Sequence, residues 1–77
     1  MILLDSMGHM ISDVSEDELH KFAIKIGLKI EWYHCHEHHP HYDLTTTRMR
    51  NRAIDNGATI VSPKEIARVL KRLKGDV

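Results

Sequence analysis

The chain has 77 residues, and its 11 Lys and Arg residues balance its 11 Asp and Glu residues, so its formal net charge is zero apart from seven histidines. This length allows one small domain, residues 1–77, and the balanced charge gives no reason to expect strong non-specific binding to nucleic acid. The single cysteine, Cys35, excludes an internal disulfide and favours a reducing cytoplasm. We expect neither a membrane span nor a signal peptide, because long apolar runs and an initial basic segment are both missing.

The first part of the chain predicts a strand, a helix and a second strand. Residues 2–5 begin with a continuous apolar run typical of a buried strand, and a polar loop follows. Ser15 and Glu18 have the spacing of a capping box and predict a helix over residues 16–26. Apolar and polar side chains alternate over residues 28–33, which indicates a half-exposed strand.

The remainder predicts a loop and then a helix, a strand and a helix. We expect residues 34–43 to form a loop, because Pro40 is incompatible with a regular strand or helix there. Thr45 or Thr46 can cap a helix over residues 46–56.

Residues 58–61 are expected to form the third strand, and the last helix covers residues 63–74. Its start is marked by Ser62, Pro63 and Glu65, which together supply a cap, a first-turn proline and a capping-box glutamate.

This order, β-α-β-α-β-α, predicts an α/β domain with a three-stranded parallel sheet. Strands separated by helices favour parallel pairing with right-handed crossovers. The first strand is the most apolar and is placed in the centre, which gives the spatial order 2-1-3. Such a sheet has two open edges and a thin core, so we also expect a homodimer.

The segment over residues 34–43 has the most unusual composition. Five of the seven histidines fall within its first eight residues, at positions His34, His36, His38, His39 and His41. Such a segment binds nickel, copper or zinc in vitro whatever its role. Two interpretations of the first four histidines therefore stay open: physiological metal binding, and adventitious binding without a biological role. Cys35 could join them, although a lone thiol is more often a packed, inert side chain.

A more discriminating prediction combines this segment with the first strand. Ligands bind outside the carboxyl ends of strands in such sheets, so Asp5, His9, His41 and Asp43 are expected to converge there. Two imidazoles and two carboxylates suit zinc, manganese or iron. They could also perform metal-free acid-base chemistry, with His41 as general base and Asp43 as the carboxylate that orients it. The structural alternative is that these side chains only close turns or pack.

Basic residues of the last two helices suggest a second kind of contact. Arg48 or Arg50, near the histidine segment, could bind an anionic ligand, and the other basic positions form either a solvated face or a phosphate-contacting one. The chain has no Gly-rich phosphate loop, Walker motif or helix-turn-helix signature.

Several short motifs resemble one known family. The segments Gly8–Asp13, Asp17–His20, His41–Asp43 and Gly57–Ala58, with Gly27 and Trp32, are similar to the small phage and bacterial proteins grouped as domain-of-unknown-function family 4031. The family pattern matches the polar positions Asp5, His9, Asp13, His20, His41, Tyr42 and Asp43. The resemblance implies a functional site at these positions and a phage or prophage setting, and it supplies no reaction. This chain departs from the pattern at Gly8, where serine is expected, and in its histidine-rich segment.

Together these observations predict a small cytoplasmic protein of a bacterial host with a divalent-metal site. Asp5, His9, His41 and Asp43 would hold zinc or manganese, His41 and Asp43 would carry the chemistry, and Tyr42, Arg50 and Asp13 would contact a phosphate-ester or nucleotide-like ligand. The competing hypothesis is a non-enzymatic phage accessory protein that binds a host protein or nucleic acid through its helices. A convergent polar cluster favours the first, and scattered cluster residues favour the second.

Overall fold

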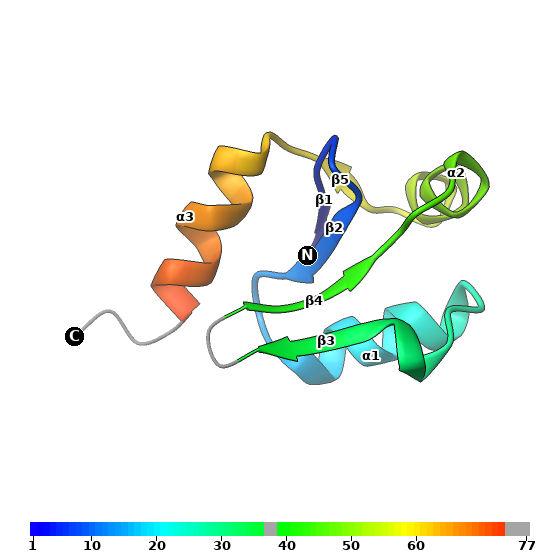
Figure 1. The fold of residues 1–77 in the computed structure, drawn as a ribbon, viewed down its shortest axis with the longest axis horizontal. Helices are drawn as coiled ribbons and strands as arrows, with labels where there is room; N and C mark the ends of the chain where they lie inside the picture. The colour runs from blue at the N-terminus through cyan, green and yellow to red at the C-terminus, as the bar shows by residue number, and fades with distance from the viewer. Residues whose placement is uncertain (37–38, 74–77) are drawn as a thin grey trace.

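The computed structural model describes residues 1–36 and 39–73, which form one five-stranded sheet with helices on both of its faces (Figure 1). The elements in chain order are β1 (Ile2–Leu4), β2 (His9–Ser12), α1 (Glu16–Lys25), a 3₁₀ turn (Ile30–Trp32), β3 (Tyr33–His36), β4 (His39–Asp43), α2 (Thr47–Asp55), β5 (Thr59–Ile60) and α3 (Pro63–Leu73). None of the helices in the described part of the chain is long and apolar enough to cross a membrane.

The sheet is mixed, and the predicted three-stranded parallel sheet of order 2-1-3 is wrong. The strand order is β3-β4-β2-β1-β5, with β1 antiparallel to β2, β2 to β4 and β4 to β3, and only β5 parallel to β1. The reason lies in the segment after β1, where the Asp5 N–H donates to the His9 carbonyl at 3.1 Å. This tight turn sends the chain straight back along β1 as β2, so no helical crossover separates the first two strands.

The strand β2 lies in the segment that was expected to be a loop. Its consecutive residues Met10 and Ile11 are both fully buried, each in a different hydrophobic cluster. A central strand that is covered on both faces does not alternate between apolar and polar residues. The short run Met10-Ile11 between polar neighbours therefore gave no recognisable strand pattern.

The predicted strand over residues 28–33 is also wrong. Residues Ile30–Trp32 form a 3₁₀ turn, and Ile30 is 65% exposed. The histidine segment instead supplies two strands, with His34 paired to His41 and Cys35 paired to Pro40. Pro40 is accommodated because β4 pairs with β2 only at Tyr42 and Asp43, so the proline lies beyond that pairing.

The three helices are confirmed to within a residue or two, apart from Lys74, which lies outside the described residues. Each helix begins at a predicted cap. The Glu18 N–H donates to Ser15 Oγ at 3.1 Å, the Met49 N–H to Thr46 Oγ1 at 3.2 Å and the Glu65 N–H to Ser62 Oγ at 3.1 Å. Local hydroxyl capping thus fixes the helix starts independently of the sheet topology.

The sheet separates two hydrophobic clusters. Helices α1 and α2 cover one face, where the buried cluster contains Ile2, Leu4, Met10, Leu19, Ala23, Ile26, Leu28, Tyr42, Leu44, Ala53 and Ala58. Helix α3 covers the other face with a smaller cluster of Leu3, Ile11, Ile66, Val69 and Leu70. Figure 1 shows the central strands between α3 on one side and α2 on the other. The outer strands of the sheet are β3 and β5, and the homodimer stays a prediction that light scattering can test.

Candidate metal site

The face of the sheet beneath α3 changes from apolar to polar between β2 and β4. His9 begins β2 and Asp43 ends β4, and the two residues are directly paired across the strands. His41 lies two residues before Asp43 in β4 and therefore belongs to the same face. Antiparallel pairing of β2 with β4, rather than the expected parallel pairing of two successive strands, brings these three side chains together.

The three side chains have ligand atoms close enough to share one metal ion. His41 Nε2 lies 3.3 Å and His9 Nε2 lies 3.9 Å from Asp43 Oδ1. One ligand atom from each of the three residues can be chosen so that all lie within 4.8 Å of one another. Two ligand atoms that are each about 2.1 Å from a tetrahedral ion are roughly 3.4 Å apart, so the observed separations fit a divalent ion after small adjustments.

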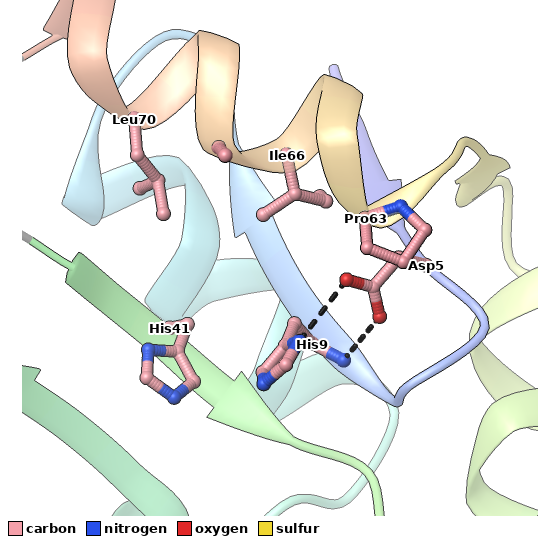
Figure 2. Close-up of a pocket in the computed structure, with 7 residues that line it drawn as sticks. Asp5, His9, His41, Pro63, Ile66 and Leu70 are labelled. Carbon is pink, nitrogen blue, oxygen red and sulfur yellow. Dashed lines mark hydrogen bonds and ion pairs between the residues drawn. The ribbon is translucent and has the colours of Figure 1, made fainter.

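Asp5 contacts both the backbone and the ring of His9 and so fixes its position. Its carboxylate is buried, and Oδ1 accepts the backbone N–H groups of Met7 and His9, each at 2.9 Å. The second oxygen, Oδ2, lies 3.0 Å from His9 Nδ1 (Figure 2). Because an ionised carboxylate only accepts hydrogen bonds, this contact favours a proton on Nδ1, and the other ring nitrogen, Nε2, faces Asp43. Asp5 therefore orients His9, and the ligand atoms nearest one another come from His9, His41 and Asp43.

His34 is a further histidine at this site. Its Nε2 lies 3.0 Å from Asp43 Oδ2, and its ring stacks on that of His41 with centroids 5.3 Å apart. From the sequence, His34 was expected to belong with His36, His38 and His39 in a loop that binds metals in vitro. Its cross-strand pairing with His41 could have been anticipated only if residues 33–43 had been recognised as a hairpin.

Two of the other predicted site residues lie elsewhere. Tyr42 points to the opposite face, as expected for a neighbour of His41 in a strand, and its hydroxyl group lies 2.8 Å from His20 Nδ1. Burial raises the pKa of Tyr42 above its ordinary value. Asp13 follows the far end of β2, where it contacts the Met1 amino group at 2.8 Å.

Arg50 lies beside the site without entering it. Its Nη1 donates to the backbone carbonyl of Asp5 at 2.7 Å, which ties helix α2 to the turn between β1 and β2. The predicted role of His38, and any role of the side chains of Cys35, His36 and His39, lies outside what the structure describes.

A cavity of about 320 Å³ adjoins the histidines. Figure 2 shows it between the sheet, which contributes Asp5, His9 and His41, and helix α3. The helix contributes Pro63, Ile66, Ala67 and Leu70. This helical wall could not be predicted from the sequence, because a stripe such as Ile66 and Leu70 has the pattern of ordinary core residues.

The fold and site define a small α/β protein with a His/Asp group on a half-covered sheet face. Residues 4–73 match the model of the family described as protein of unknown function (DUF4031), and the chain belongs to that family. This match confirms the resemblance inferred from the short motifs. Comparison with curated proteins and with solved structures gave no match.

Proposed function

We propose that this protein binds a divalent metal ion, zinc or manganese, through His9, His41 and Asp43, and that the loaded site acts on a phosphate ester. The observation that carries the proposal is the relation between His9 and Asp43. Asp5 Oδ2 lies 3.0 Å from His9 Nδ1 and favours the tautomer protonated at Nδ1, and His9 Nε2 lies 3.9 Å from Asp43 Oδ1, so that in this tautomer two acceptors face each other. A cation between them turns this unfavourable arrangement into two coordinate bonds.

The ligand set suits a catalytic ion better than a structural one. Two imidazoles and one carboxylate leave at least one coordination position for water or a substrate oxygen, whereas structural zinc sites use four protein ligands. The Asp5–His9 pair also has the form of a carboxylate–histidine–metal arrangement, in which the carboxylate sets the tautomer and raises the basicity of the imidazole.

A phosphate ester is the substrate class that best suits such an ion in this setting. A bound divalent ion would polarise a phosphoryl oxygen and lower the pKa of a coordinated water. No Lys or Arg is among the described residues that line the cavity, so the ion would be the main positive charge for the phosphate. The amino end of α3, at Pro63, also borders the cavity and favours negative charge there.

The same geometry has a metal-free interpretation that an experiment can separate from this one. His41 Nε2 lies 3.3 Å from Asp43 Oδ1, as in a pair where a carboxylate orients a general base. The rival accessory-protein hypothesis was expected to leave the polar residues scattered, and their proximity in the structure favours a site.

Zinc and manganese titration calorimetry is the direct test. The background variant carries alanine at positions 36, 38 and 39, so that adventitious binding by these histidines is removed while His34 stays. In this background we expect zinc binding that His9→Ala or His41→Ala weakens by about 100-fold or more, since each removes one of three ligands.

His20→Ala is the matched control, because His20 lies on the opposite face with Tyr42. It should leave zinc affinity unchanged. Zinc binding that disappears with the three replaced histidines, or that survives both ligand substitutions, contradicts the metal site.

Hydrolysis is tested separately with a chromogenic phosphate monoester. We expect phosphate release that a chelator abolishes and that added zinc or manganese restores. Release that persists in the chelator but is lost in His41→Ala would favour the metal-free acid-base interpretation.

A further inference from the structure

We infer that the ligand of this site is a phosphate monoester of a compact apolar alcohol or phenol, and not a nucleotide. The inference rests on the proposed metal site and adds the identity of the group that the phosphate carries. It comes from the cavity, whose two walls differ in chemistry (Figure 2).

The wall formed by the sheet is polar and suits the phosphate end. His9 and His41 face the cavity from β2 and β4, and both belong to the group that can hold the ion. Asp5 also borders the cavity, but its oxygens already accept hydrogen bonds from Met7 and His9. A phosphate bound to the ion would therefore lie at this wall.

The wall formed by α3 offers only carbon to the remainder of the ligand. The four contributing side chains, of Pro63, Ile66, Ala67 and Leu70, contain no hydrogen-bond donor or acceptor. A ribose or base placed against them would lose hydrogen bonds to water without replacing them, and an unpaired buried polar group is costly. An apolar group gains from the same contact.

This wall is also rigid. Ile66 and Leu70 are 4% and 8% exposed, and they belong to the cluster that contains Leu3 and Ile11. Because they are part of the core, the wall cannot move aside for a larger ligand without loss of packing.

The size of the cavity points to a small ligand. Its volume of about 320 Å³ is at the lower end of the roughly 300–1,000 Å³ typical of ligand pockets. A single ring or short alkyl chain with its phosphate suits this space. The cavity reaches the surface at Pro63 and Ala67, which are exposed, so a larger residue at position 67 would narrow it.

The test compares two non-hydrolysable probes, phenylphosphonate and methylphosphonate, by calorimetry on the zinc-loaded protein. We expect phenylphosphonate to bind about 10- to 100-fold more tightly, as for the burial of one aromatic ring. Ala67→Leu should abolish this preference, because its side chain occupies the space for the ring. Arg72→Leu is the matched control, since it adds leucine to an exposed position of α3 that does not line the cavity, and it should retain the preference.

Zinc affinity is measured for every variant, and it should be the same in Ala67→Leu as in the wild type. If that substitution disturbs zinc binding, Ala67→Met, with an unbranched side chain, replaces it. Equal affinities for the two phosphonates, or tighter binding of adenosine monophosphate than of phenylphosphonate, would overturn the inference while zinc binding still supports the metal site. A protein that binds neither zinc nor manganese would overturn both.

Discussion

The two faces of the sheet differ in the number of buried apolar side chains and in the polar groups that they carry. The face under α1 and α2 carries an apolar cluster of eleven buried residues that includes side chains from β1, β2 and β4. Among the described residues, the face under α3 has a cluster of five, to which the sheet contributes Leu3 of β1 and Ile11 of β2. Most of the hydrophobic stabilisation therefore comes from the first face, and the second face is free to carry polar groups.

The polar part of the second face lies beside the apolar cluster that α3 covers, and it borders the cavity under this helix. The side chains of His9 and Asp43 are 40% and 35% exposed, and that of His41 is 14% exposed. Polar groups at this level of exposure keep contact with water and do not require burial of a charge. A chain of this length can therefore place a polar His/Asp group on one face of its sheet while its larger hydrophobic cluster lies on the other.

Leu4→Ala would test this division most severely. Leu4 is fully buried in the larger cluster, and we expect the free energy of unfolding to fall by about 2–5 kcal/mol, from lost transfer energy and the cavity left behind. Urea denaturation measures the change, and Ile60→Ala, at a position that is 51% exposed, should cost less than about 1 kcal/mol. Similar losses for the two variants would show that burial in the larger cluster does not decide the cost of losing an apolar side chain.

Gly8→Ser tests the turn between β1 and β2, and it introduces the serine that the family resemblance led us to expect at this position. Gly8 has φ +89°, and an added Cβ would lie 2.5 Å from the Leu44 carbonyl oxygen. Strain and contact together should destabilise the protein by about 1–3 kcal/mol.

Gly57→Ser is the control for Gly8→Ser. Gly57 also has a positive φ of +109°, but an added Cβ would meet no atom within 4 Å. Thermal denaturation should show a smaller loss for Gly57→Ser, and an equal loss would mean that the contact with Leu44 relaxes freely.

Asp5→Asn sharpens the comparison on the polar face. An asparagine oxygen can still accept a hydrogen bond, but the negative charge that sets the His9 tautomer is lost. We expect zinc affinity to fall by about 10- to 100-fold, the usual effect of removing a carboxylate behind a ligating histidine. Calorimetry in the background without His36, His38 and His39 measures it, and unchanged affinity would show that Asp5 serves the turn alone.

The smallest effect concerns pH and the end of the β1–β2 hairpin far from the site. The Ser12 hydroxyl and then the Met1 ammonium donate hydrogen bonds to Glu18 and lower its pKa from 4.5. This contribution to stability is complete above that value and is lost as the pH falls through the lowered pKa. Asp13, and then Glu18, raise the pKa of the Met1 amino group above 8.0, so its contribution is lost as the pH rises through the raised value.

The urea concentration at the unfolding midpoint, measured across the acid and alkaline ranges, will show both the loss of stability at low pH and the loss at high pH. Glu18→Gln should reduce the loss of stability at acid pH only slightly, because Met1 is 61% and Glu18 38% exposed and solvent weakens their interaction. Glu31→Gln, at an exposed position in the 3₁₀ turn, is the isosteric control and should leave the curve unchanged. A curve that is the same for Glu18→Gln and the wild type would show that these ion pairs do not contribute.

The helices could be predicted from the sequence because their starts are set by local chemistry. Ser15, Thr46 and Ser62 each accept a hydrogen bond from a backbone N–H three residues later, and this needs no knowledge of the sheet. The strands could not be predicted so directly. The strand β2 is covered on both faces, with Met10 buried on one side and Ile11 on the other, so it shows no alternation of apolar and polar residues. The alternation of apolar and polar residues around Ile30 belongs instead to an exposed 3₁₀ turn.

The site shows the same division between local and non-local information. His9, His41 and Asp43 were selected for their chemistry, but the reason for their proximity is the β2–β4 pairing, which depends on contacts distant in sequence. Tyr42 was expected at the site because the family resemblance includes it. Adjacent residues of a strand face opposite ways, and treating residues 34–43 as a loop gave no sign that Tyr42 and His41 lie on different faces.

The turn after β1 has a consequence for how this family can change over time. Asp5 closes the turn through the N–H groups of Met7 and His9 and also fixes the His9 ring. Under the proposed metal function, a relative that has lost metal binding would still need aspartate at position 5 for the turn, whereas positions 41 and 43 would be free to change. Such a loss should therefore be visible first at the two β4 positions.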